Sequence, residues 1–233
     1  MSDHRPTLVF LHEGLGSAEL WRAFPQQVAG ALGGAPILVY SRRGYGHAGT
    51  VRLPRPVTYM HDEAVVLVDL LRAERIVRPI LVGHSDGASI ALIAAGRGLD
   101  VHSLVLIAPH VFVEDRSITG IEAAKAAYES GTLRERLARH HDHVDVAFRG
   151  WNDTWLSAEF RSWDITEFLP SIACPVLLIQ SVDDPYGTVA QLDAIEAQVA
   201  GPVQRLVVPG ATHSPHVDAR ETVLATIAEF VGV

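Results

Sequence analysis

Gly83-His84-Ser85-Asp86-Gly87 is the stretch of sequence that decides how this chain folds. It follows the apolar run Pro79-Ile80-Leu81-Val82 and precedes the helix-forming residues 88–95. This order predicts a sharp turn from a strand into a helix, which holds the serine hydroxyl in the open beside a base. A Cβ at either glycine would collide with the neighbouring strand or helix. We therefore predict that Ser85 is a nucleophile on an α/β sheet.

Two later strands are each followed by a residue that can activate such a serine. Residues 174–180 predict a buried strand, and Asp183 and Asp184 come directly after it. Residues 203–208 predict another strand, which leads through a short loop into His213. An acid followed by a histidine, each after a later strand, is the chain order of a Ser-His-Asp triad on this kind of sheet.

The chain resembles the α/β-hydrolase family over nearly its whole length. Apart from the turn around Ser85, the resemblance rests on three segments: Leu11-His12-Glu13-Gly14-Leu15-Gly16-Ser17, Ser41-Arg42-Arg43-Gly44-Tyr45-Gly46 and Gly210-Ala211-Thr212-His213-Ser214-Pro215-His216. It implies that Ser85 is the nucleophile and that His213, which matches the family's catalytic histidine, is the general base. His216, at the expected start of a helix, is then a structural histidine.

The resemblance also places the acid and the groups that would stabilise an oxyanion. Aligning Ser181 with the glycine that usually begins the acid loop puts the acid at Asp184, and Asp183 would then brace the turn. The first oxyanion donor is the N–H of Asp86, the residue after the nucleophile. The second comes from the loop after the first strand, where Gly14 is the expected donor and Leu15 the reserve.

Two acidic side chains stand close to this predicted site. Glu13 occupies a position where relatives have glycine, and a carboxylate beside a developing oxyanion is unfavourable. We expect Glu13 to point away, to contact the substrate or, preferably, to form a salt bridge with a cation such as Arg42 or Arg43. Asp86 falls in the first turn of a helix, where the helix dipole stabilises an anion by about 0.3–1 kcal/mol. We interpret its side chain as structural.

Short apolar runs alternate with helical patterns along most of the chain, as in βαβ units. We predict a doubly wound, mostly parallel sheet of about six strands, without the two antiparallel strands that usually open the family's sheet. The predicted strands are 7–12, 36–40, 79–84, 103–108, 175–180 and 204–208. The predicted helices of this core are 18–32, 59–73, 86–97, 189–199 and 219–231.

The alternation stops between Pro109 and Ala173. We divide the chain into a core, 1–110 and 171–233, and an inserted segment, 111–170, for which the resemblance implies a helical cap. Helical patterns at 118–129, 132–140 and 144–149 are followed there by an aromatic segment. Its large side chains either line a substrate pocket or form the cap's own core: Trp151, Trp155, Phe160 and Trp163.

A histidine cluster in the same segment, His140-His141-Asp142-His143-Val144-Asp145, raises the question of a metal. Its beginning matches part of a dinuclear zinc signature, but Val146 stands where that signature requires another histidine. We prefer a solvated helix end and expect no metal and no cofactor.

Composition is that of an ordinary globular protein: 233 residues, 48% hydrophobic and 20% charged. The net charge of −8 argues against a nucleic-acid partner, which calls for clustered Lys and Arg. A single cysteine, Cys174, excludes an internal disulfide framework. The polar N-terminus predicts no signal peptide, and no apolar run is long enough to span a bilayer. We expect a cytoplasmic monomer or homodimer that acts on a small molecule and has no membrane partner.

The resemblance implies a serine hydrolase that works through an acyl-enzyme, and a small carboxylic ester is the preferred substrate. Relatives with the same triad cleave thioesters, carbon–carbon bonds or N-terminal peptide bonds. An alternative of another class is a small-molecule sensor on the hydrolase fold. The complete set of Ser85, Asp184 and His213 favours catalysis.

Overall fold

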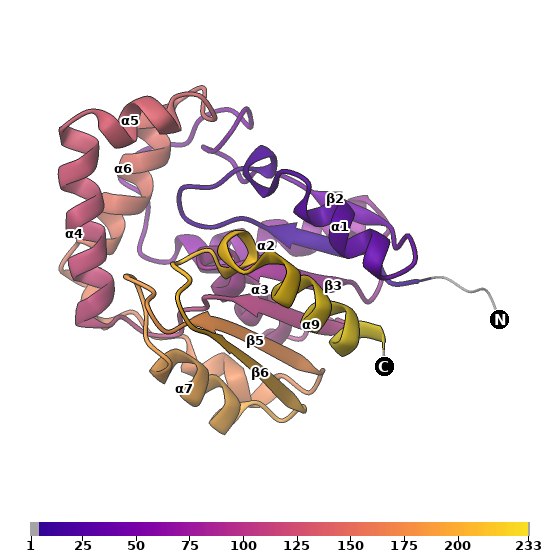
Figure 1. The fold of residues 1–233 in the computed structure, drawn as a ribbon. Coiled ribbons are helices and arrows are strands. Elements are labelled where there is room, and N and C mark those ends of the chain that lie inside the picture. The colour runs from indigo at the N-terminus through magenta and orange to yellow at the C-terminus, as the bar shows by residue number, and fades with distance from the viewer. Residues whose placement is uncertain (1–4, 233) are drawn as a thin grey trace.

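Six parallel strands form a single sheet in the computed structural model, which describes residues 5–232. The strand order is β2-β1-β3-β4-β5-β6 (Figure 1). The strands are β1 (Leu8–Leu11), β2 (Ile37–Val39), β3 (Ile80–His84), β4 (Ser103–Ile107), β5 (Val176–Ser181) and β6 (Val203–Val208). The six predicted strands and the parallel sheet are confirmed. Residues 1–4, part of the polar N-terminus used to predict the absence of a signal peptide, lie outside the described residues.

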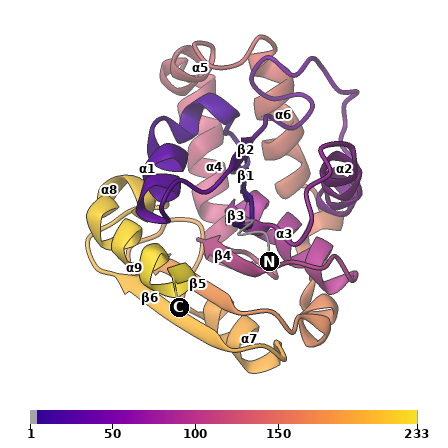
Figure 2. The same ribbon diagram turned by 90° about the vertical axis from the view of Figure 1, so that its right-hand side faces the viewer.

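Helices cover both faces of the sheet, which explains why its strands are continuous apolar runs. Figure 2 shows α1 and α9 on one side and α2 and α3 on the other. In β1, Leu8 and Phe10 pack with the first pair, whereas Val9 and Leu11 pack with the second. The bounds are α1 (Phe24–Ala31), α2 (Tyr59–Ala73), α3 (Asp86–Gly96), α7 (Ala190–Gln198) and α9 (Arg220–Gly232).

In the core, one predicted helix is divided in the structure and one short helix is added. The predicted helix 18–32 is divided into a 3-10 helix, η1 (Ala18–Trp21), and α1, because Pro25 lacks an N–H and its ring crowds the carbonyl of the preceding turn. The chain bends at Arg22, which has a φ of 52°. A short helix, α8 (Pro215–Asp218), precedes α9.

The segment between β4 and β5 is mostly helical, and Figure 1 shows α4, α5 and α6 stacked to one side of the sheet. Helix α6 continues beyond its predicted end because Ala147, Phe148, Trp151 and Trp155 share one buried face. The division of the chain into core and cap stays a prediction. The elements are α4 (Asp115–Glu129), α5 (Thr132–Leu137), α6 (Val144–Trp155), η2 (Glu159–Ser162) and η3 (Thr166–Ser171).

The two glycines that flank the nucleophile position lie where β3 and α3 meet closely. A Cβ built on Gly83 would lie 2.6 Å from Cα of Ala88. A Cβ on Gly87 would overlap the carbonyl oxygen of Leu11 in β1. Both obstacles are backbone, which cannot move aside as a flexible side chain can. The predicted requirement for glycine at these positions therefore has a direct steric cause.

Gly87→Ala is expected to destabilise the protein by roughly 3 kcal/mol or more, because the new methyl group must displace a sheet strand. Gly30→Ala is the matched control: Gly30 is exposed in α1, and a Cβ there meets nothing within 4 Å. Its replacement should be neutral or stabilising by up to about 1 kcal/mol. Urea unfolding of the two variants measures the difference, and equal stabilities would contradict the steric argument.

Within residues 5–232, no helix combines the length and the apolar character needed to cross a bilayer.

Candidate active site

Ser85 stands between β3 and α3 in a backbone conformation that few residues adopt. Its φ is 53° and its ψ is −119°, a region that costs a residue with a Cβ of order 1–3 kcal/mol. The Ser85 N–H donates to the Ile107 carbonyl of β4 at 2.8 Å, which anchors the turn to the neighbouring strand. The hydroxyl borders a cavity of about 210 Å³. A strained turn that presents a hydroxyl to a cavity is the geometry of a nucleophile elbow.

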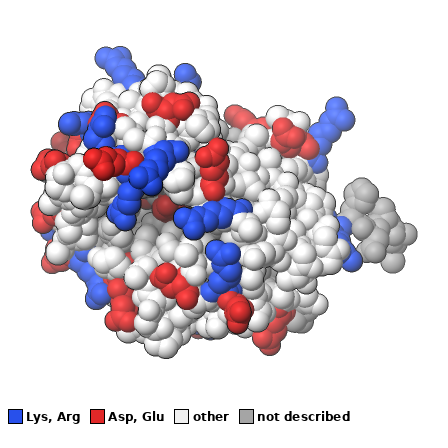
Figure 3. Space-filling model, turned by 45° about the horizontal axis from the view of Figure 1, so that its top comes forward, with Lys and Arg blue, Asp and Glu red and all other residues white. Residues whose placement is uncertain are grey.

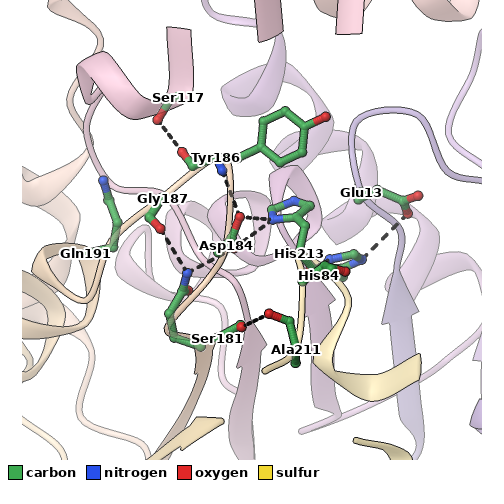
Figure 4. A network of polar contacts seen from close by, with 12 residues as sticks. Glu13, His84, Ser117, Ser181, Asp184, Tyr186, Gly187, Gln191, Ala211 and His213 are labelled. Carbon is green, nitrogen blue, oxygen red and sulfur yellow. Dashed lines mark hydrogen bonds and ion pairs between the residues drawn. The ribbon is translucent and has the colours of Figure 1, made fainter. Parts of the chain in front are cut away.

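His213 lines the same cavity and is held by the carboxylate of Asp184 (Figure 4). Its Nδ1 lies 2.9 Å from Oδ1 and 2.8 Å from Oδ2 of Asp184. Because Nδ1 is engaged, Nε2 is the nitrogen available to a serine hydroxyl. The ring packs edge-on against Tyr186, with centroids 4.7 Å apart. The structure therefore brings the predicted base and the predicted nucleophile to one cavity.

Asp184 is fully buried, and its carboxylate is stabilised by several donors. Besides His213, the N–H of Tyr186 donates to Oδ1 at 2.8 Å and Nε2 of Gln180 donates to Oδ2 at 2.9 Å. Burial alone would raise the pKa of Asp184, but the charge and hydrogen bond of His213 and the Tyr186 N–H lower it to about 2. Asp184 is therefore ionised at neutral pH and fixes the orientation of the His213 ring.

The neighbouring candidate acid, Asp183, has a different environment. Its side chain is exposed and accepts a hydrogen bond from the Gly210 N–H at 3.2 Å, which joins the loop after β5 to the loop after β6. This contact is of the bracing kind expected for Asp183. Of the two acids, only Asp184 contacts His213 among the described residues.

Three backbone N–H groups have no protein acceptor among the described residues: those of Gly14 and Leu15, which line the cavity, and that of Asp86, which follows Ser85. They are the donors that the sequence analysis proposes for an oxyanion. Gly14 packs against the Trp151 indole so closely that a Cβ would overlap it. Free amide donors at the edge of a cavity are suited to binding developing negative charge.

The predicted salt bridge from Glu13 to Arg42 or Arg43 is wrong. Arg42 donates from Nη2 to the backbone carbonyl of Glu13 at 2.9 Å. The Glu13 carboxylate instead lies 3.7 Å from Nδ1 of His84, the second residue of the elbow (Figure 4). Although burial opposes ionisation, contact with His84 lowers the pKa of Glu13. Glu13 also lines the cavity, so this residue is both a neighbour of His84 and part of the wall around the substrate space.

Asp86 has the structural environment expected of it. It is fully buried and accepts a hydrogen bond of 2.5 Å from the Tyr59 hydroxyl of α2. Nε1 of Trp155 donates in turn to the Tyr59 oxygen at 3.0 Å, and Nη2 of Arg42 lies 3.9 Å from the carboxylate. The side chain of Asp86 thus links α2, α3 and α6, while its N–H has no protein acceptor among residues 5–232.

The tryptophans of the inserted segment divide between the two expected roles. Trp151 and Trp155 line the cavity. Trp163 does not; its ring stacks on Phe160 at 5.2 Å and lies 5.9 Å from Trp155. Of the two roles that the sequence left open for Trp163, the structure therefore favours the aromatic core beneath the helices. The sequence contains no signal for this division. All three tryptophans are buried, so the apolar pattern is the same for a cavity wall and for a core.

His110 is a cavity residue that the sequence analysis missed. It comes shortly after β4, at the carboxyl end of a parallel strand, which is a position that favours site residues. Burial and the nearby charge of His213 lower the pKa of His110 to about 4. A neutral imidazole therefore faces the substrate space. The other lining residues that sequence reasoning missed are Ser117, Ile121, Tyr186 and Ser214.

The structure agrees with the expectation for one further histidine and contradicts it for another. His216 is buried in α8 against Trp21 and Phe24, in agreement with a structural role. His141 is 4% exposed and contacts Gly46 and Leu15, so the expected solvated helix end is wrong at this position. Within residues 5–232, no three His, Cys, Asp or Glu side chains are grouped as metal ligands.

Charges on the surface do not concentrate at one place on the face shown in Figure 3, where basic and acidic side chains are interspersed. Exposed pairs such as Arg205 with Asp193, at 2.7 Å, contribute at most about 1 kcal/mol each. Three charged residues near the site, Asp184, Asp86 and Arg42, are buried.

Comparisons with known proteins support the fold described above. The model of the alpha/beta hydrolase family matches residues 8–226. Human serine hydrolase BPHL is 25% identical over 188 residues, which cover 77% of this chain. The match covers 64% of that relative, which is less than two thirds of its length. An esterase from Exiguobacterium antarcticum has a TM-score of 0.76 at 19% identity, covering 98% of this chain and 92% of its own. The enol-lactonase from Burkholderia xenovorans LB400 has a TM-score of 0.75 at 19% identity, with the same coverage. At such identities the structures show the fold alone.

Proposed function

Because the chain belongs to the alpha/beta hydrolase family, we propose that it is a serine hydrolase that cleaves a small carboxylic ester through an acyl-enzyme. The observation that carries the proposal is the pairing of His213 with a buried, ionised Asp184 at the cavity that Ser85 also lines. Such a pair converts a weakly nucleophilic hydroxyl into an effective one.

In the proposed reaction the Ser85 oxygen attacks the ester carbonyl while Nε2 of His213 accepts the hydroxyl proton. The N–H groups of Asp86 and of Gly14 or Leu15 bind the tetrahedral oxyanion. His213 then gives its proton to the departing alcohol, which leaves an ester of Ser85. A water molecule, deprotonated by His213, attacks this ester and releases the carboxylic acid, and the proton returns to Ser85. This chemistry requires no cofactor.

The cavity supports a short acyl group. Its volume is about 210 Å³, and Leu15, Ile121, Trp151 and Trp155 provide apolar walls. We expect kcat/KM to fall roughly tenfold or more from p-nitrophenyl butyrate to p-nitrophenyl octanoate, because the longer acyl chain overfills the cavity and must displace its walls, at a cost of about 1–3 kcal/mol. Initial rates below the solubility limit of each ester measure this. Equal or rising kcat/KM with chain length would contradict a small acyl pocket.

Oxygen esters are preferred because their cleavage needs only the groups described above. The enol-lactonase among the similar structures acts, by its name, on a cyclic oxygen ester, which supports the same bond class. Thioesters, carbon–carbon bonds and N-terminal peptide bonds are the alternatives within this machinery. Rates on acyl-CoA thioesters, a vinylogous diketone and amino-acid anilides, compared with the esters, rank these bond classes.

The alternative of another class is a small-molecule sensor that uses the fold without turnover. A fluorophosphonate probe separates the two, because it reacts covalently only with an activated serine. Peptide mapping should locate the probe on Ser85. A folded protein that is left unlabelled and inactive on all these substrates would favour the sensor.

A further inference from the structure

One side chain of the histidine cluster joins the inserted segment to two loops of the sheet. His141 lies between α5 and α6, and the Gly46 N–H donates to its Nδ1 at 2.9 Å. Its Nε2 lies 3.0 Å from the carbonyl oxygen of Leu15. Because Nδ1 accepts a hydrogen bond, the proton of the neutral ring is on Nε2, which therefore donates to Leu15. The contacts define one tautomer and one orientation of the ring.

Two peptide units of the loop after β1, with one peptide unit between them, are held by different parts of the molecule. The Glu13 carbonyl, which belongs to the same peptide as the Gly14 N–H, accepts from Arg42 at 2.9 Å and from the Gly16 N–H at 3.1 Å. Both donors, Arg42 and Gly16, belong to the core part of the chain, residues 1–110 and 171–233. The Leu15 carbonyl is held by His141, from the inserted segment. The loop that carries two candidate oxyanion donors is therefore fixed partly by the core and partly by the helices above it.

Among the described residues, the inserted segment reaches the Leu15 carbonyl through the His141 side chain alone, whereas it reaches Gly46 through both that side chain and the backbone. The Asp142 N–H also donates to the Gly46 carbonyl at 3.0 Å, and this backbone bond survives any substitution at position 141. The junction between the segment and the loop around Gly46 thus has a second support. Among the described residues, the Leu15 carbonyl has no other donor.

We propose that His141 is a positioning residue: by donating to the Leu15 carbonyl, it makes the inserted segment hold the oxyanion loop in the orientation that faces Ser85. The inference rests on the proposed function for its kinetic consequence. It gives the segment a part in stabilising the transition state in addition to its contribution to the cavity wall.

Two substitutions at position 141 separate the contacts of the ring. Gln places its amide nitrogen near the position of Nε2 and keeps a donor toward Leu15, whereas Asn places its amide oxygen near Nδ1 and keeps an acceptor toward Gly46. We expect His141→Gln to retain kcat on p-nitrophenyl butyrate within about threefold, and His141→Asn and His141→Ala to lose roughly 10- to 100-fold in kcat with little change in KM. His143→Gln is the matched control, because His143 is exposed and should leave kcat unchanged.

A second readout does not need activity. The Gly16 N–H belongs to the same peptide as the Leu15 carbonyl, so its NMR amide signal should be preserved in His141→Gln and shifted or broadened in His141→Asn. Equal effects of Asn and Gln on kcat and on this signal, or a loss in Gln with retention in Asn, would overturn the inference. If the wild-type protein is neither active nor labelled at Ser85, the proposed function fails, and the Gly16 signal alone then decides whether His141 holds the loop.

Discussion

Ser85→Ala is expected to reduce hydrolysis of p-nitrophenyl butyrate to the background rate, a loss of roughly six orders of magnitude in kcat if the residues act as a triad. The alanine has no hydroxyl with which to attack the carbonyl. The fold should persist, because the Ser85 hydroxyl makes no hydrogen bond among the described residues and the substitution keeps the Cβ. The free energy of unfolding, measured by thermal denaturation, should change by less than about 1 kcal/mol.

Ser214→Ala is the matched control for that loss. Ser214 contributes the hydroxyl side chain next to His213, lines the same cavity and caps no helix with its side chain. Its replacement should leave kcat within about tenfold of the wild-type value. Activity retained in Ser85→Ala, or an equal loss in both variants, would remove Ser85 from the nucleophile role.

Asp184→Asn is expected to lower kcat by roughly four orders of magnitude, whereas Asp183→Asn should cost less than about tenfold. An Asn amide beside Nδ1 of His213 favours the tautomer with its proton on Nε2, which is unable to accept the Ser85 proton. Asp183 is exposed and only braces the turn at Gly210. Steady-state kinetics of the two variants give the comparison, and thermal unfolding shows whether each is folded. The reverse ranking would move the acid to position 183.

Local patterns predicted the strands and the order of the triad because both depend on short-range properties. The run from Ile80 to Val82 is apolar on both faces, which indicates a strand buried between helices. The glycines at 83 and 87 indicate a turn that has no room for a Cβ. Since parallel strands end at the same edge of a sheet, residues after β3, β5 and β6 were expected to meet there, and Ser85, Asp184 and His213 do line or support one cavity.

Predictions that depended on which side chain meets which were less successful. Glu13 pairs with His84 instead of Arg42 or Arg43. Arg42 lies beside Glu13 as expected, but its guanidinium donates to the Glu13 backbone carbonyl and approaches Asp86. Charge type alone does not select a partner, because orientation and desolvation decide which of several nearby pairs forms.

The amino-acid sequence by itself determined that this chain forms a parallel α/β sheet with a serine at a strand-to-helix turn, followed by an acid and a histidine. Hydrophobic periodicity, glycine sterics and chain order are properties of neighbouring residues, and they can be read without coordinates. Only the tertiary structure decided that Trp151 and Trp155 face the cavity while Trp163 does not, that His110 joins them, and that His141 reaches Leu15. These contacts join segments far apart in the chain, and their geometry follows from the packing of all the helices and strands together.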